Sequence, residues 1–379
     1  MIKIAPLKAL QPGKDLFELL ITDQANDKLH KNEQPSFEDL LNLFGCALND
    51  LPAIYIYEFL GENGVMRGIW AAIDLSLTPE NAIKRHEETL SSKVASIMVD
   101  RKGKSIQKSP ILLVHKKDKT LAALIDFVVR TRKPLENEWS QMGHFLYQVP
   151  EEELVKQFVE EFKNVKSLYL ADGHHRLEAA FALQQSRPQQ ISSLLVSADM
   201  ISISAFHRMI TVTGAFCPSF MEKLKAHYYI SKIPNNRPYK PDRKNRIGLF
   251  FKGEWYQLDL NGDSALSAMP DTAILQDYIL APVLGIHKPK EDERLICFPD
   301  CKWAQFLAEL EGDENAIGFS LFPMTADAFI TFAEKGEFLP PKSTWIAPKV
   351  PQGLMACSSA AIEAKGEQVK DKLMVKLIR

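Results

Sequence analysis

The chain has 379 residues, of which 46% are hydrophobic and 25% are charged, as in an ordinary globular protein. Its 46 Lys and Arg residues nearly balance 48 Asp and Glu residues, which leaves a net charge of -2. Such a protein exerts no bulk attraction on nucleic acid or anionic lipid, so an anion must be bound by a local cluster of residues. The length is sufficient for two domains.

Cysteine usage bears on the cellular compartment. The five cysteines are Cys46, Cys217, Cys297, Cys301 and Cys357. An odd number of scattered cysteines predicts no disulfide framework and favours a reducing cytoplasm. Cys297 and Cys301 are spaced CxxxC without a second such pair, so we expect no structural zinc site.

No membrane segment is expected. The start "MIKIAPLKALQPGKD" lacks the apolar region of a signal peptide. The longest apolar stretch, residues 273–286, contains Gln276, Asp277 and Pro282, and it is too short to span a bilayer.

Strand-like and helix-like segments alternate along the first 206 residues. Residues 53–60 and 67–75 predict a hairpin, and Thr78-Pro79-Glu80 predicts the start of a helix over 78–101. We further expect strands at 109–115, 144–150, 167–171 and 191–206, and helices at 120–130, 151–165 and 176–185.

A stretch rich in Pro, Asn and Arg, residues 233–246, predicts a linker between two domains. Beyond it we expect a hairpin at 247–260, helices at 271–286, 303–312 and 325–336, and strands at 294–299 and 316–323. The charged tail, residues 363–379, is expected to form a surface helix.

The stretch "SLYLADGHHRLEAAFAL", residues 167–183, predicts a strand, a tight turn and a helix. A helix N-terminus presents unpaired N–H groups and partial positive charge, so it attracts anions. Arg176 could hold phosphate oxygens in a bidentate manner, and His174 or His175 could add a donor or act as acid or base. In the simpler interpretation, Asp172 caps the helix and the basic residues are solvated; metal binding by the two histidines is disfavoured, because adjacent side chains diverge on a helix.

The segment "IKRHEET", residues 83–89, concentrates charged side chains. On a helix, Lys84 and Glu88 would be neighbours on a salt-bridged surface. In the functional interpretation, Glu87 or Glu88 is a general base or Mg²⁺ ligand, and Lys84 or Arg85 contacts phosphate. The segment is not the HExxH motif of zinc proteases, because the residue in the second His position is Leu90.

Two further motifs contain basic residues that suggest an anion site. "GEFLPPKST", residues 336–344, has the spacing of a Walker A loop, but Pro341 replaces the second glycine and offers no N–H. We therefore expect a rigid loop from which Lys342 could still reach a ligand. A second His-Arg pair, His207 and Arg208, would enlarge an anion pocket if it lay beside Arg176.

Together, "ADGHHRLEAA", "IKRHEET", "FHRMI", "AILQDYILAPVLGI" and "EFLPPKSTWIAPKVPQGL" resemble the bacterial and archaeal domain of unknown function 1015 over most of the chain. Some members carry the label of ParB-like partition protein. The "DGHHR" turn is also similar to the phosphate-binding turn of the ParB and sulfiredoxin fold, and to the turn with which a free-serine kinase of that fold binds ADP. This resemblance implies that Asp172, Gly173, His174, His175 and Arg176 bind nucleotide phosphate.

The N-terminus departs from the family pattern. Family members carry an "APPYDV"-like stretch near the start, where this chain has "LQPGKDLFELLITDQ", residues 10–24. If that stretch lines the site, the activity of this member is altered or lost.

The sequence and the resemblance together predict an α/β or α+β fold. We expect a ParB/sulfiredoxin-like core with a mixed sheet over residues 1–232, the linker 233–246, and a C-terminal α/β region over 247–379. The expected function is that of a nucleotide-dependent phosphotransferase or nucleotidase acting on a small metabolite, with ATP or ADP and Mg²⁺.

In this prediction Glu87, Glu88 and His174 are catalytic. The phosphate-binding residues are Asp172, Gly173, His175, Arg176, Lys84, Arg85 and Arg208. The alternative is a nucleotide-sensing ParB-like binding protein without turnover, which would form a homodimer when it binds its ligand. Near-neutral charge argues against nucleic acid as a partner.

Overall fold

The computed structural model describes residues 1–10, 52–61, 64–103, 106–136, 139–184, 190–212, 219–262, 269–347, 349–351 and 353–358. The chain forms two compact units. Unit 1 comprises Met1–Lys84, Thr89–Met200 and Val350–Arg379, and unit 2 comprises Arg85–Glu88 and Ile201–Lys349. Each unit has its own sheet and core.

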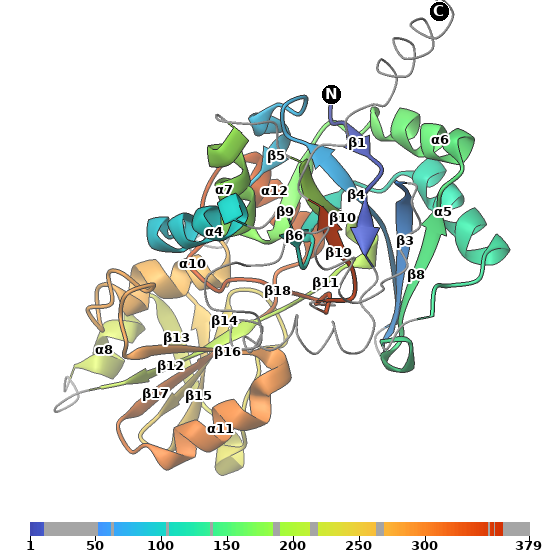
Figure 1. The fold of residues 1–379 in the computed structure, drawn as a ribbon. Coiled ribbons are helices and arrows are strands. Elements are labelled where there is room, and N and C mark those ends of the chain that lie inside the picture. Colours follow the sequence, from blue (N-terminus) through green and yellow to red (C-terminus); the bar gives the residue numbers. More distant parts are fainter. Residues whose placement is uncertain are drawn as a thin grey trace, which may run out of the picture. The chain divides into compact units, whose positions relative to one another are not determined.

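Unit 1 is built on an eight-stranded mixed sheet, in the order β5-β9-β7-β10-β4-β3-β8, with β1 paired to β4 (Figure 1). Within it, β5 runs parallel to β9, and β7 runs parallel to β10, whereas the other pairs are antiparallel. The strands are β1 (Ile4–Ala5), β3 (Ile54–Gly61), β4 (Gly64–Asp74), β5 (Ile83–Lys84), β7 (Ile111–His115), β8 (His144–Val149), β9 (Leu168–Asp172) and β10 (Gln190–Ser197).

Four α-helices belong to the described part of unit 1; the apolar faces of the last three join one core with the sheet, and the first packs against the last. They are α4 (Ser91–Gly103), α5 (Lys119–Thr131), α6 (Glu152–Phe162) and α7 (His174–Gln184). Helix α6 illustrates the pattern, because Val155, Phe158 and Phe162 are buried at helical spacing while its acidic residues face solvent. Helix α5 begins where the Asp118 carboxylate accepts the Leu121 N–H, as an N-cap does.

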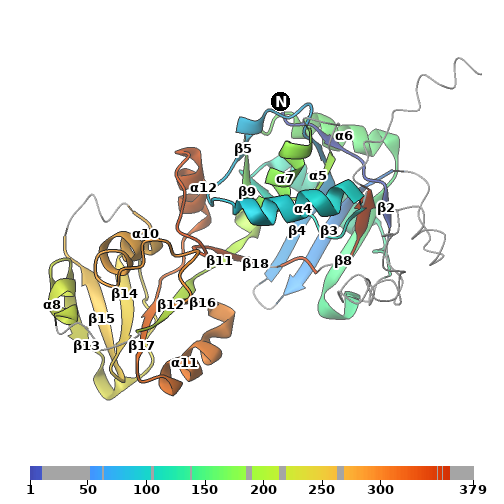
Figure 2. The ribbon, with the colours of Figure 1, turned by 60° about the vertical axis from the view of Figure 1, so that its left-hand side comes forward.

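A small sheet brings three distant segments of unit 1 together. Strand β19 (Ala356–Ser358) lies between β2 (Ala9–Leu10) and β6 (Ile106–Gln107). Strand β19 is labelled in Figure 1, and β2 is labelled in Figure 2. The chain therefore returns to unit 1 after completing unit 2.

Unit 2 has a six-stranded antiparallel sheet, in the order β13-β15-β14-β17-β12-β16. Its strands are β12 (Phe206–Thr211), β13 (Tyr228–Lys232), β14 (Arg246–Phe251), β15 (Glu254–Leu260), β16 (Leu295–Pro299) and β17 (Ala316–Ser320). A separate pair joins β11 (Ser202–Ser204) to β18 (Trp345–Ala347).

Alternate side chains of β14 join two different hydrophobic cores, one on each face of the sheet. Ile247, Leu249 and Phe251 join a cluster that contains helices α8 (Phe220–Lys225) and α10 (Asp271–Leu275), whereas Phe250 joins a cluster that contains α11 (Trp303–Gly312). Figure 2 accordingly shows α8 and α11 on opposite sides of the sheet. The helix α12 (Ala326–Glu334) completes the unit, with Thr325 as its N-cap.

The mixed α/β class predicted from the sequence is confirmed, but two local features differ. The predicted helix over 78–101 is wrong at its start: residues 80–82 form a short 3-10 turn, Ile83–Lys84 form β5, and the α-helix begins only at Ser91. The pairing of β5 with β9 explains the difference, because the sheet gives this segment partners that its local sequence does not reveal.

The division of the chain also differs from the predicted one. Residues 233–246 connect β13 to β14 within one sheet, and the chain passes from unit 1 to unit 2 after Met200. Pro and Asn residues suit such a connection as well as a linker, and Asn235, Asn236 and Asn245 have positive φ there. The predicted tail helix, 363–379, and all but the first residue of the departing stretch 10–24 lie outside the described residues.

Among the described residues, no helix combines the length and apolarity needed to cross a membrane.

A buried charge cluster in unit 1 gives a test of the fold. Glu58 is 5% exposed and accepts hydrogen bonds from Arg67 Nε at 2.7 Å and from the Tyr147 hydroxyl at 2.8 Å. Removal of one partner of a buried pair leaves an uncompensated charge. We expect Arg67→Met to lower the free energy of unfolding by about 3 kcal/mol in urea denaturation.

Adding Glu58→Gln to that variant should restore part of the loss, and Lys156→Met, which breaks an exposed pair with Glu152, should leave stability nearly unchanged. A double variant no more stable than Arg67→Met would contradict the proposed cause.

Candidate functional site

The "DGHHR" motif forms the predicted strand, turn and helix in unit 1. Strand β9 ends at Asp172, Gly173 has φ +92°, and α7 begins at His174. A Cβ atom on Gly173 would lie 2.7 Å from Ile111 Cγ2 and 3.0 Å from Arg176 Nη2. Glycine is therefore required both by the backbone angle and by the close approach of its neighbours.

Arg176 braces this turn. Its Nη1 donates to the carbonyl oxygens of Ser109 and Pro110 at 3.0 and 2.7 Å and to the Ser109 hydroxyl at 2.6 Å, while Nη2 pairs with Asp172 at 2.9 Å. Burial lowers the pKa of the guanidinium, and the Asp172 charge opposes that effect. The sequence led us to expect an arginine open to phosphate, but its terminal nitrogens are used to join α7 to the start of β7.

His175 has a similar bracing contact. Its Nε2 accepts the Leu90 N–H at 3.0 Å, so this nitrogen presents a lone pair and the ring is neutral. Lys84, near the start of the "IKRHEET" segment, pairs with Tyr169 in the parallel β5-β9 ladder. Both flanks of that segment thus lie beside the strand and helix of the "DGHHR" motif within unit 1.

The groups of this turn that suit an anion are mainly backbone N–H groups. Helix α7 has 11 residues, and the first N–H groups of such a helix point outward along its axis, at the positive end of the dipole. The first of its residues, His174, is 9% exposed and is the histidine placed nearest to that end.

The residues between the two flanks, Arg85–Glu88, belong to unit 2. His86 is 1% exposed, and its ring meets the edge of Phe329 with centroids 4.8 Å apart. Its Nε2 lies 3.2 Å from Thr344 Oγ1, and its carbonyl oxygen accepts the Leu339 N–H at 2.8 Å. His86 therefore anchors the "LPPKST" loop, residues 339–344.

Arg208 holds the same loop from β12. It is 3% exposed and donates to the carbonyl oxygens of Pro341 and Lys342 at 3.0 and 2.9 Å, and to that of Phe206 at 3.2 Å. Burial lowers the pKa of its guanidinium, while the charge of Glu87 acts in the opposite direction. A phosphate-binding loop presents N–H groups, whereas this loop turns carbonyl oxygens toward a cation, so the Walker A resemblance has no counterpart in the geometry.

The predicted acid–base residues differ in their surroundings. Glu88 is exposed and pairs with Lys290 at 3.6 Å, and its carbonyl oxygen accepts from the same ammonium group at 2.8 Å. Glu87 is half-buried, and its charge acts on Arg208. Glu87 is thus the better shielded of the two carboxylates. Its predicted proximity to the "DGHHR" motif involves both units and stays a prediction.

Several partners in these clusters could not be predicted from the sequence. Ser109 and Pro110, Leu90, and Pro341 take part through backbone atoms. Backbone groups are the same at every position, so no residue type marks them in the sequence.

The bracing role of Arg176 can be tested by stability. In Arg176→Met the carbonyl groups of Ser109 and Pro110 lose their donor, so we expect the free energy of unfolding to fall by about 1–3 kcal/mol in chemical denaturation. Arg130→Met, at an exposed position on α5, is the control and should change little. An Arg176→Met variant that is as stable as the wild type but binds phosphate more weakly would show that Arg176 contacts phosphate and does not stabilise the turn.

Comparisons with known proteins place these motifs in context. At 14% identity, the chain is similar to the structure of a conserved hypothetical protein from Pyrococcus furiosus, with 76% of this chain and 95% of that chain covered and a TM-score of 0.42. It is similar at 14% identity to a free serine kinase in complex with AMP, with 73% and 87% covered and a TM-score of 0.41. It is similar at 11% identity to SbnI from Staphylococcus aureus with a C-terminal truncation, with 79% and 93% covered and a TM-score of 0.42.

A comparison with curated proteins finds no match. The model of the family described as "Protein of unknown function (DUF1015)" matches residues 47–278, which include the "IKRHEET", "DGHHR" and "FHRMI" motifs. The chain belongs to the DUF1015 family.

Proposed function

We propose that the protein binds a nucleotide through its phosphates at the N-terminus of α7 and transfers a phosphoryl group to a small metabolite or to water. One observation carries the proposal: β9 passes through Gly173, at φ +92°, directly into an 11-residue helix. Such a turn brings a row of N–H groups and the helix dipole to one point, which is the environment that phosphate oxygens favour.

The motif side chains have distinct roles in this proposal. Asp172 and Arg176 fix the turn through their ion pair of 2.9 Å, Gly173 allows its backbone angle, and His175 holds Leu90. His174 and the backbone N–H groups of α7 contact the phosphates. Rigid positioning of this kind is a large part of phosphoryl-transfer catalysis.

In the proposed reaction, the terminal phosphoryl group leaves the nucleotide and bonds to a hydroxyl oxygen of the acceptor. Glu87, the better shielded of the two carboxylates, accepts the proton of that hydroxyl group, with Glu88 as the alternative. Lys84 and Arg85 balance the charge on the transferring group. A nucleotide shortened by one phosphate is the other product.

Mg²⁺ fits this proposal through the nucleotide. The described residues contain no group of three or more His, Cys, Asp or Glu side chains that could hold a metal. A Mg²⁺ ion that bridges phosphate oxygens needs only one or two carboxylates and keeps several waters. Glu87 or Glu88 would supply that carboxylate.

A second candidate is a ParB-like protein that senses a nucleotide without turnover. The observation that favours it is the use of both motif arginines, Arg176 and Arg208, on carbonyl groups of the chain itself. Arginines so bound do not stabilise the charge of a transferring phosphoryl group, whereas a backbone anion site still binds phosphate. Homodimerisation on nucleotide binding would accompany this function.

Turnover and binding can be separated with one variant. We expect ATP or ADP to bind in calorimetric titration and ATP with Mg²⁺ to lose a phosphate, and we expect Glu87→Gln to reduce the rate by about 100-fold while leaving nucleotide affinity unchanged. The measurements are phosphorus NMR of the products and titration of both proteins.

Glu309→Gln, at an exposed position on α11, is the matched control and should keep full activity. Nucleotide binding without any turnover would support the sensing function, and the absence of nucleotide binding would refute both candidates.

A further inference from the structure

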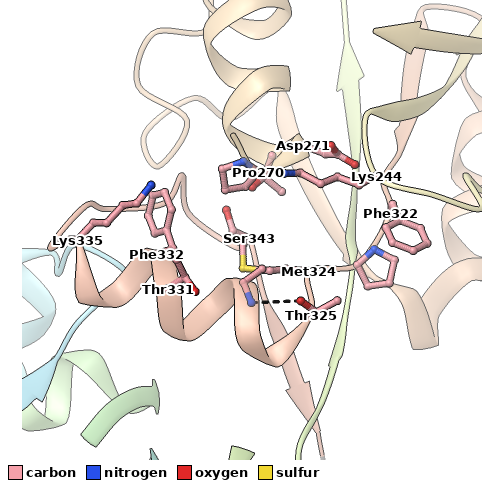
Figure 3. Close-up of a pocket in the computed structure, with 13 residues that line it drawn as sticks. Lys244, Pro270, Asp271, Phe322, Met324, Thr325, Thr331, Phe332, Lys335 and Ser343 are labelled. Carbon is pink, nitrogen blue, oxygen red and sulfur yellow. Dashed lines mark hydrogen bonds between the residues drawn. The ribbon is translucent and has the colours of Figure 1, made fainter. Parts of the chain in front are cut away.

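A second candidate site lies wholly within unit 2, in a pocket of about 230 Å³. It is bounded by the turn before α10, by the segment between β17 and α12, and by α12 itself (Figure 3). This volume is below the roughly 300–1,000 Å³ of pockets for drug-sized ligands, so the pocket suits a molecule of about the size of a single substituted ring.

The charged groups of the pocket favour an anion. Lys244 and Lys335 are drawn at opposite sides of it in Figure 3, with Ser343 between them. The one carboxyl group, Asp271, is 6% exposed, and burial raises its pKa to about 6. Asp271 already accepts the Asn245 N–H at 2.9 Å, and the charge of Lys244 acts on it, so the second lysine gives the pocket a positive balance.

Hydroxyl groups add further donors. Thr272 is 9% exposed, and its hydroxyl is buried without a hydrogen-bond partner among the described parts of the chain. Thr325 accepts the Ala328 N–H at 3.2 Å as the N-cap of α12, which leaves its hydroxyl hydrogen for donation outward. A carboxylate is a small anionic group that accepts hydrogen bonds from ammonium and hydroxyl donors together.

The position of Ser343 is set by the "LPPKST" loop. Lys342 has φ +57°, an uncommon angle for a residue with a side chain, and such strain persists where surrounding contacts over-determine it. The contacts are those of Arg208 with the carbonyl groups of Pro341 and Lys342. Ser343, only 6% exposed, donates to Pro340 at 2.6 Å and is thereby fixed in the wall of the pocket.

Most of the remaining lining residues of the pocket are apolar. Phe322, Pro323, Met324 and Phe332 line the pocket together with Pro270. Apolar walls with a few polar groups are typical of sites that bury the body of an organic ligand, and an inorganic anion would leave these walls without a partner.

We propose that this pocket binds a small carboxylate with an apolar or aromatic body. The carboxylate group lies between Lys244 and Lys335 and accepts from Thr272, and the apolar body lies against Phe322, Met324 and Phe332. The proposal uses different residues from the nucleotide site, because none of its residues belongs to the "DGHHR" motif or to Arg85–Glu88.

The test uses the whole chain and three matched compounds: phenylacetate, the neutral 2-phenylacetamide, and acetate, which lacks the ring. We expect calorimetric titration to show binding of phenylacetate, with the other two weaker by about tenfold or more. Lys244→Met should weaken phenylacetate binding by about ten- to a hundredfold, and Thr272→Val should weaken it less. Lys302→Met, at an exposed position before α11, is the control and should bind as the wild type does.

Three results would overturn the proposal: equal binding of phenylacetate and its amide, equal binding of acetate, or an unchanged affinity in Lys244→Met. Thermal melts of each variant show that a change in affinity is not a change in folding. A loss of nucleotide binding would leave these outcomes unaffected, so the two proposals can fail separately.

Discussion

Two guanidinium groups, each held by backbone carbonyl oxygens of its own unit, organise the "DGHHR" motif and the "LPPKST" loop. Arg176 joins α7 to the entrance of β7, and Arg208 joins β12 to the "LPPKST" loop. A buried cation is costly unless its hydrogen-bonding groups are matched. Carbonyl groups at the right spacing meet most of this need, together with the Asp172 carboxylate at Arg176, so each arginine fixes the course of the segment whose carbonyl groups it holds.

This arrangement separates the shape of a site from its chemistry. In unit 1, the side chains of the motif contact other parts of the protein, as Arg176, Asp172 and His175 do. The groups proposed to bind an anion are then the backbone N–H groups at the start of the helix that these side chains position. In unit 2, Arg208 and His86 place a strained loop, and the residue that reaches a pocket is Ser343. In this chain, two basic residues of the motifs, Arg176 and Arg208, thus mark places where the backbone is held by a side chain.

Much of the fold could be predicted from the sequence, because most elements have strong periodic patterns. The helix with buried Val155, Phe158 and Phe162 is one example, and the strand, glycine turn and helix of the "DGHHR" motif is another. The segment after Pro79 was predicted as a helix because Thr78-Pro79-Glu80 suits a helix start, whereas its actual partners are the distant strand β9 and the "LPPKST" loop. Residues 233–246 resembled a linker because turns inside a sheet use the same Pro and Asn residues.

The site residues that the sequence did not reveal share one physical property: their role depends on the environment and not on residue type. Asp271 stands in an apolar run that reads as an ordinary helix, and only its burial raises its pKa to about 6. Lys244, Thr272, Thr325 and Ser343 are common residues in four separate segments, and only the packing of α12 and its flanking loops brings them to one pocket. Motif reasoning finds groups that are close in sequence, so it located the turn at Gly173 and passed over a pocket assembled from residues a hundred positions apart. For a chain of this length, the chemistry of a ligand is therefore better read from the charges and walls of a folded pocket than from the residues that stand out in the sequence.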